Sequence, residues 1–273
     1  MSATRETSDR RIDLAIGGIA GLSGGLLGVG GGFVMVPLQV VWARRDQHRA
    51  NGTSLAAILP IALVAAAMYY FGSSTPQTDL SVALFLAAGS AIGALLGALA
   101  ARRIPERALK VIVAILLVGV GMKEVYDAVV AAPQLVLVGT SVRSFGPADY
   151  ALIAAGGLVI GVVSGLAGVG GGILIVPFLA LGFGIGQRIA QGTSLVAILP
   201  TAAIGALTYH RSGNVDVRAA AWMAGAGVPA ALVGSALALW LPQRVLGGVF
   251  GVFLLFAATR IWPRRARADL PIR

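Results

Sequence analysis

The sequence predicts an all-α polytopic membrane protein of two inverted-topology repeats, each a glycine-broken helical hairpin followed by three transmembrane helices. Three observations support this prediction: an apolar composition, an internal repeat, and an uneven distribution of arginine and lysine. Of the 273 residues, 57% are hydrophobic and 12% are charged, which is about half the charged share of a soluble domain. Such a chain has too few polar side chains to cover a surface that faces water, so a membrane protein is expected.

The composition also excludes several kinds of chemistry. The chain has no cysteine, which removes disulfides, thiolate metal sites and cysteine nucleophiles. Its net charge of +10 would suit nucleic acid, but the basic residues occur in short clusters between apolar runs, as at Arg44-Arg45. This pattern is typical of cytoplasmic loops that contact anionic lipid headgroups. The expected partners are therefore the lipid bilayer and a small anionic substrate, with no nucleic acid; a homodimer is left open.

An internal repeat covers most of the chain. Two motifs recur at one offset of 140 residues: Gly-Val-Gly-Gly-Gly at 28–32 and 168–172, and Gly-Thr-Ser-Leu at 52–55 and 192–195. Aligned without a gap, residues 21–69 and 161–209 are identical at 23 of 49 positions. Further along, Asp79 pairs with Asp216, at an offset of 137. The chain therefore contains two copies of one unit.

The apolar runs define the expected membrane spans. A span needs about 20 residues, so two of the runs are too long for one upright helix, and each of these is interrupted by the glycine motif. Each is either one tilted helix or a hairpin whose two limbs enter and leave on the same side. The runs lie at roughly 12–43, 52–72, 80–101, 108–130, 149–182, 192–209, 217–240 and 243–262.

Arginine and lysine favour the hairpins, because short cytoplasmic loops are enriched in them. If every run crosses once, 12 of the 21 basic residues lie inside; if the long runs are hairpins, 17 do. The second unit then begins on the external face, so the two units are inverted, as in many secondary transporters. Loss of the first run as a cleaved signal peptide is not expected, because it would remove half of a matched pair. The predicted organisation is a first repeat at 12–130, an external linker at 131–148, a second repeat at 149–262, and cytoplasmic tails at 1–11 and 263–273, with the protein in the plasma (inner) membrane.

The glycine motifs are the candidate binding site. After each one a helix restarts, at Phe33 and at Ile173, and its first amides and positive dipole end favour an anion. The two glycine turns are expected to meet near the centre of the membrane. The alternative is that the glycines only allow tight helix packing. The candidate substrate-binding residues are Gly28, Gly30, Gly31, Gly32, Phe33, Gly168, Gly170, Gly171, Gly172 and Ile173.

The second motif allows two interpretations. Its Thr and Ser side chains either cap the start of the following helix or add hydroxyl donors along the substrate path, and both roles are compatible. These residues are Thr53, Ser54, Thr193 and Ser194. Prolines near both motifs are expected to break or kink helices; they are Pro37, Pro60, Pro177 and Pro200.

Charged residues are scarce inside the runs. Glu124 and Asp127 are the exceptions among the acidic residues, and a surface ion pair with Lys123 at i, i+4 is expected there. The sequence shows no carboxylate pair, Ser-His-Asp set or metal cluster, so no enzyme activity, metal or cofactor is expected. Export of an anion fits this absence, because moving one negative charge out of a negative-inside cell releases about 2.3 kcal/mol per 100 mV and needs no coupling ion.

Gly-x-Gly-Gly-Gly followed by Val-Pro, then Gly-Thr-Ser-Leu and a proline, occurs twice in this chain. This doubled pattern resembles the TauE/SafE sulfite exporter family over about residues 12–262. The resemblance implies a membrane permease for sulfite, a sulfonate such as sulfoacetate, or a related small sulfur or carboxylate anion. The family's glycine-rich motifs correspond to Gly28 and Gly30–Gly32, and to Gly168 and Gly170–Gly172.

The predicted function is export of a small oxyanion by alternating access. The alternatives are an anion channel with the same site, a permease for another small carboxylate or oxyanion, and a membrane module without transport activity.

Overall fold

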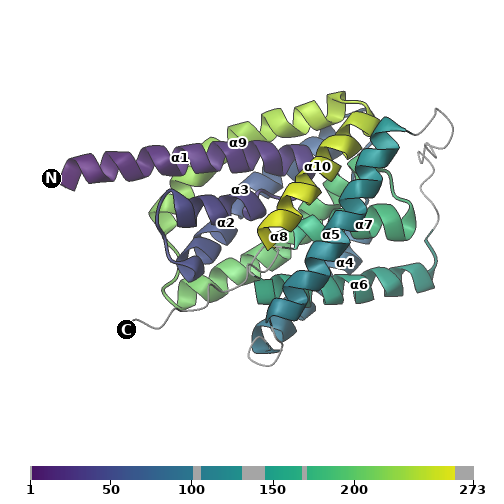
Figure 1. Ribbon diagram of the computed structural model, residues 1–273, viewed down its shortest axis with the longest axis horizontal. Helices are drawn as coiled ribbons and strands as arrows, with labels where there is room; N and C mark the ends of the chain where they lie inside the picture. Colours follow the sequence, from purple (N-terminus) through teal and green to yellow (C-terminus); the bar gives the residue numbers. More distant parts are fainter. Residues whose placement is uncertain (1, 101–105, 131–144, 168–170, 262–273) are drawn as a thin grey trace, which may run out of the picture.

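The computed structural model describes residues 2–100, 106–130, 145–167 and 171–261. Over these residues the chain forms ten helices joined by short connections (Figure 1). The helices are α1 Ser2–Leu27, α2 Gly32–Val41, α3 Gln47–Phe71, α4 Leu80–Ala100, α5 Glu106–Val129, α6 Pro147–Ala167, α7 Gly172–Phe183, α8 Gln187–Arg211, α9 Val217–Trp240 and α10 Gln243–Ile261. The predicted tail at 263–273 and most of the predicted linker at 131–148 lie outside the described residues.

Several helices begin earlier than the apolar runs do. Helix α1 starts at Ser2, so the predicted tail at 1–11 is largely helical; this stretch holds no glycine or proline, and a formed helix gains one hydrogen bond for each residue added. Helices α3 and α8 start at Gln47 and Gln187, five residues before their apolar runs. The Gly-Thr-Ser-Leu motifs therefore lie inside these helices and not at their starts.

The chain reverses direction at the first glycine motif. Helix α1 ends at Leu27 and α2 begins at Gly32. A Cβ atom at Gly31 would lie 2.3 Å from the carbonyl oxygen of Ala20, so the start of α2 lies against α1. Just beyond the other end of α2, Arg45 reaches back to Asp13 in the middle of α1. This confirms the predicted glycine-broken hairpin; that both limbs open to one side of the membrane stays a prediction.

The second hairpin has the same form. Helix α7 follows α6 after a break, and a Cβ atom at Gly171 would lie 3.4 Å from Ser164 of α6. Further along the hairpin, a Cβ atom at Gly156 would meet the ring of Phe178. The two limbs are therefore antiparallel here too. Residues 168–170 of the turn lie outside the described residues.

The two repeats exchange helices to build one core. The first helix of each repeat packs on the fourth helix of the other, α1 on α9 and α6 on α4. The third helices, α3 and α8, contact each other, and so do the fifth helices, α5 and α10. Figure 1 shows α1 running beside α9 and α10 beside α5. Because each of these four pairings crosses between repeats, the repeats form one body and not two separate domains.

Glycines allow the closest of these approaches. Gly17, Gly21 and Gly25 lie four residues apart on α1, facing α9, and a Cβ atom at Gly21 would lie 2.2 Å from the carbonyl oxygen of Gly227. Helix α4 approaches α6 in the same way, with a Cβ atom at Gly89 2.0 Å from the oxygen of Ala154. Small residues at this spacing are a common means of packing membrane helices.

The outer surface suits a bilayer. Among the described residues, five helical segments are long and apolar enough to cross a membrane. Large apolar side chains also face outward, such as Leu84 on α4 and Phe71 on α3, which are 69% and 79% exposed. Soluble proteins rarely expose large apolar surfaces to water, whereas lipid covers them in a membrane. The five segments are α3, residues 147–164 of α6, α8, α9 and α10.

Two local predictions can be compared with the helices. Lys123 Nζ lies 2.6 Å from Asp127 Oδ2 on the surface of α5, so the expected i, i+4 ion pair is confirmed. All four prolines expected to break or kink helices lie inside helices that continue past them, so none of them ends a helix; bends at these positions stay a prediction. They are Pro37 in α2, Pro60 in α3, Pro177 in α7 and Pro200 in α8.

Candidate functional site

The first glycine motif forms a tight turn whose backbone favours glycine. Gly28, Gly30 and Gly31 have φ angles of 69°, 71° and 79°, a left-handed conformation that is strained for residues with a Cβ atom. Gly31 is the N-cap of α2 and offers no side-chain acceptor. The turn therefore ends at a helix start that no side chain caps.

The first two backbone amides of α2 have no hydrogen-bond acceptor within the helix. Val34 and Met35 both donate to the carbonyl oxygen of Gly31, at 3.1 and 2.9 Å. The amides of Gly32 and Phe33 come before them and have no acceptor within the helix. The sequence predicted that the helix restarts at Phe33; in the structure α2 begins one residue earlier, at Gly32.

The second motif ends in the same arrangement. Gly171 is the N-cap of α7 with φ of 68°, and its carbonyl oxygen accepts from Leu174 and Ile175 at 3.0 and 3.3 Å. The amides of Gly172 and Ile173 thus correspond to those of Gly32 and Phe33. Gly168 and Gly170, the other predicted site residues of this motif, lie outside the described residues.

The start of α7 meets the first glycine turn in the interior. A Cβ atom at Gly172 would lie 2.8 Å from the carbonyl oxygen of Val29, so the start of α7 contacts the first turn. Both sides of this contact are buried. Glycine at position 172 is therefore needed for this close contact, which is compatible with both the packing role and the binding role considered from the sequence.

The first turn is held between the third helices of both repeats. A Cβ atom at Gly30 would lie 2.4 Å from Ile198 Cδ1 and 3.3 Å from Ile58 Cγ2, and these isoleucines occupy equivalent positions in α8 and α3. At Gly28, a Cβ atom would lie 2.4 Å from Cβ of Gln191. One polar side chain of α8 thus lies directly against the turn.

The threonines of the second motif join the two repeats. The hydroxyl oxygen of Thr53 accepts from the backbone N–H of Asp216 at 3.0 Å, and that of Thr193 accepts from the N–H of Asp79 at 3.0 Å. Each aspartate in turn caps the first turn of the next helix, α9 or α4. The interpretation of these threonines as N-caps of their own helices was wrong, because α3 and α8 begin six residues earlier. Their hydroxyls instead fix where the helix of the opposite repeat begins.

The two serines of the motif differ in their partners. Ser54 Oγ accepts from Gln39 Nε2 at 2.6 Å. Ser194 Oγ, at the equivalent position in α8, is fully buried and has no hydrogen-bond partner among the described residues. The repeats are therefore similar in backbone but not in polar contacts.

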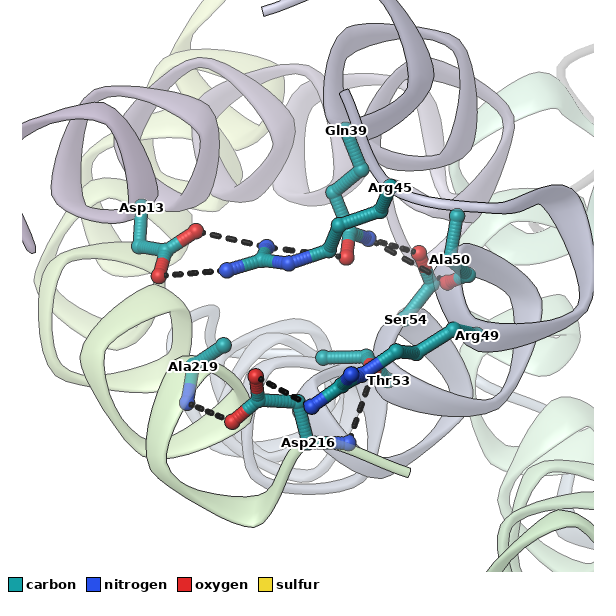
Figure 2. A network of polar contacts seen from close by, with 9 residues as sticks. All are labelled: Asp13, Gln39, Arg45, Arg49, Ala50, Thr53, Ser54, Asp216 and Ala219. Carbon is teal, nitrogen blue, oxygen red and sulfur yellow. Dashed lines mark hydrogen bonds and ion pairs between the residues drawn. The ribbon is translucent and has the colours of Figure 1, made fainter. Parts of the chain in front are cut away.

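An ionic network ties the first hairpin to α3 (Figure 2). Arg45 donates to both carboxylate oxygens of Asp13, at 2.7 and 2.8 Å, and to Gln39 Oε1 at 3.1 Å. Gln39 Nε2 in turn donates to Ser54 Oγ and to the carbonyl oxygen of Ala50. The side chains of Arg45 and Asp13 are only 12% and 4% exposed. The expectation that Arg45 contacts lipid headgroups is wrong, because its guanidinium is buried against a carboxylate.

This network belongs to the first repeat alone. The positions equivalent to Asp13, Gln39 and Arg45 carry Ile153, Leu179 and Ile185. Sequence reasoning missed the network because it judged each charge by its distance from the end of a run. The signal it could have used is the presence of Asp13 and Arg45 at opposite ends of one predicted hairpin.

The chemistry of the glycine turns is that of neutral hydrogen-bond donors. The backbone amides of α2 and α7 and the amide of Gln191 lie there, and positive helix ends attract anions. Within the described residues, no three His, Asp or Glu side chains gather to hold a metal ion. The expected absence of a metal or cofactor stays a prediction.

Comparison with known proteins identifies the family. The family model described as sulfite exporter TauE/SafE matches residues 2–124 and 153–272. The chain belongs to the TauE/SafE family. The resemblance carried by the doubled glycine motif is thus confirmed, and the protein is a membrane transporter of this family.

Curated relatives agree with this assignment. A probable membrane transporter protein, YunE, of Bacillus subtilis (strain 168) is 29% identical over 219 residues, covering 74% of this chain and 79% of the relative. A probable membrane transporter protein of Xylella fastidiosa (strain 9a5c) is 28% identical over 250 residues, covering 90% and 92%. No solved structure matches the chain.

Proposed function

We propose that this TauE/SafE protein is a secondary transporter that exports a small sulfur-containing anion, such as sulfite or a sulfonate like sulfoacetate, by alternating access. The observation that carries the proposal is the buried contact between the first glycine turn and the start of α7, where both α2 and α7 begin without a side-chain cap. Unpaired amides at helix starts favour negatively charged groups, and glycine lets a ligand approach the backbone closely. No catalytic step forms part of this function.

The burial of the first turn supports a carrier in preference to a channel. Residues 27–33 are all buried, and Gly30 lies between Ile58 and Ile198. An anion held there would be separated from water until the helices around it move. Alternating access supplies that movement, whereas a channel needs a continuous wet path.

The reciprocal contacts support an inverted arrangement of the two repeats. Exchange of α1 onto α9 and of α6 onto α4 is what a two-fold relation between repeats produces. A unit with an odd number of crossings then faces the opposite way from its copy, as in other transporters with a central site. The proposed protein is a multi-pass protein of the plasma (inner) membrane with both termini in the cytoplasm.

Single-cysteine labelling tests this orientation, because the chain has no native cysteine. His48 is exposed in the first turn of α3, and Ser74 and Ser212 are exposed in connections between helices. In intact cells, a membrane-impermeant maleimide is expected to label Ser74→Cys and to leave His48→Cys and Ser212→Cys unlabelled until the cells are lysed. External labelling at His48 would contradict the hairpin topology.

Flux through purified protein tests the activity. In proteoliposomes loaded with sulfite or sulfoacetate, an imposed negative-inside potential is expected to accelerate efflux, because one exported negative charge gains about 2.3 kcal/mol per 100 mV. The efflux should saturate with anion concentration. Flux that requires a pH gradient at zero membrane potential would contradict the uncoupled export.

The same preparation separates the rival functions. Saturable exchange of labelled anion indicates a carrier, and a single-channel current in the picoampere range indicates a channel. A thermal-shift comparison of sulfite, sulfoacetate, taurine, sulfate and lactate identifies the preferred class of ligand. Stabilisation by lactate alone would favour a carboxylate permease over a sulfur-anion exporter.

A further inference from the structure

One face of α8 carries buried polar side chains without partners. Gln187, Gln191 and Ser194 lie at i, i+4 and i+7, which places them on a single face of the helix. Their exposed fractions are 8%, 0% and 0%. Gln187 Nε2, Gln191 Nε2 and Ser194 Oγ have no hydrogen-bond partner among the residues that the structure describes. All three are groups that can donate a hydrogen bond.

The equivalent face of α3 is satisfied within its own repeat. Gln47 Nε2 donates to Asn51 Oδ1 at 3.3 Å, and Ser54 accepts from Gln39 of α2. In the second repeat, Leu179 occupies the position of Gln39 and offers no polar atom. Leaving a buried donor unpaired costs about 1–3 kcal/mol. A face that keeps three of them is explained most simply by a ligand that completes them.

Gln191 joins this face to the first glycine turn. Its side chain packs on Gly28, whose Cβ atom would lie 2.4 Å from that of Gln191. Its Oε1 accepts from the hydroxyl of Tyr69 at 3.0 Å, and Tyr69 is itself fully buried. Because the oxygen of the Gln191 amide accepts from Tyr69, its Nε2–H group, which has no partner among the described residues, remains available on a side chain that packs on the turn.

Another unpaired group lies against the last turn of α1, just before the glycine turn. Ser235 Oγ on α9 is fully buried, without a partner among the described residues, and lies 2.9 Å from where a Cβ atom of Gly25 would be. The hydroxyl of Tyr69 also lies 3.1 Å from the carbonyl oxygen of Gly25, so its single proton is shared between this oxygen and Gln191 Oε1. The unpaired groups at the end of α1 and at the first turn therefore come from α9 and α8 of the other repeat.

We propose that Gln191 binds the transported anion at the first glycine turn through its Nε2–H group, and that Tyr69 is the positioning residue that orients this amide. The proposal rests on the proposed function and deepens it. The ligand would bridge Gln191 and the amides of Gly32 and Phe33, which have no acceptor among the described residues. This requires at least two acceptor oxygens, as in sulfite or a sulfonate. The equivalent Asn51 has no such role, so the two turns contribute unequally.

Binding to the full-length protein in detergent, measured by calorimetry with sulfite and with sulfoacetate, tests this. Gln191→Met removes the amide at nearly constant volume and is expected to weaken binding about 10- to 100-fold, the effect of one hydrogen bond to a charged group. Gln191→Glu keeps the acceptor for Tyr69 but replaces the donor with an acidic group, so it should weaken binding at least as much. Asn51→Leu, the matched control, should change the Kd by less than about 3-fold.

A double-mutant cycle tests the role of Tyr69. Tyr69→Phe alone should weaken binding, because the amide loses the group that orients it. The same change should have no further effect in the Gln191→Met background. Equal losses in both backgrounds would overturn the positioning role, since a purely structural effect does not depend on Gln191.

The possible results separate the two proposals. If the wild type binds neither anion, both the proposed function and the role of Gln191 are overturned. If the wild type binds and Gln191→Met binds equally well, only the role of Gln191 is lost. Sodium binding that Gln191→Glu strengthens would show that the amide presents Oε1 to a cation, which also overturns this role. Should Gln191→Met fail to fold, Gln191→Asn, which withdraws the amide from the turn, is expected to lose the same affinity.

Discussion

Replacing Arg45 with alanine is expected to destabilise the protein by about 3–5 kcal/mol. The change leaves the Asp13 carboxylate buried without its guanidinium, and an uncompensated buried charge costs about that much. Gln39 also loses the group that fixes its oxygen. The measurement is the unfolding midpoint of purified protein in detergent, compared with that of the wild type.

The second repeat provides the matched control for this prediction. At the positions of Asp13, Gln39 and Arg45 it carries isoleucine, leucine and isoleucine. The triple variant Asp13→Ile, Gln39→Leu, Arg45→Ile is therefore expected to recover most of the lost stability, because well-packed apolar residues often replace a buried ion pair without a net cost. A triple variant as unstable as Arg45→Ala would show that the polar network stabilises the protein beyond what apolar packing at these positions provides.

Substituting alanine for Gly21 should be equally damaging. The added Cβ atom would lie 2.2 Å from the carbonyl oxygen of Gly227, so α1 and α9 would have to separate along their whole contact. Overpacking a tight contact costs about 1–3 kcal/mol and occasionally more. Because backbone atoms cannot rotate away, we expect about 3 kcal/mol and a fall in the unfolding midpoint of about 10 °C.

Gly18 provides the control on the same helix. A Cβ atom there meets nothing within 4 Å, and alanine favours a helix over glycine by about 1 kcal/mol. Gly18→Ala should therefore leave the midpoint unchanged or raise it slightly. If both alanine variants lower the midpoint equally, the close approach of α1 to α9 is not what glycine at position 21 provides.

Much of the fold follows from local chemistry and was accessible from the sequence. The glycine motif breaks each long apolar run, because strings of glycine disfavour a helix and permit left-handed turns. Phe33 and Ile173 were placed within one residue of the helix starts for the same reason. The repeat then predicted that whatever held for one hairpin would hold for the other.

The roles of individual polar residues were not accessible in this way. Thr53 lies beside Asp216 although 163 residues separate them in the chain, and no pattern around either residue records that contact. The local pattern, a hydroxyl before an apolar run, suggested a cap on the wrong helix. Gln191 was passed over for a similar reason, since only the fold places it against Gly28.

The reciprocal contacts of the two threonines have a consequence for how the chain is synthesised. The first turn of α4 is completed by Thr193, which leaves the ribosome 114 residues after Asp79. The nascent first half must therefore remain in the bilayer with an unfinished helix start until the second half arrives. An ancestral chain of half this length could have met the same need only by pairing with a second copy of itself.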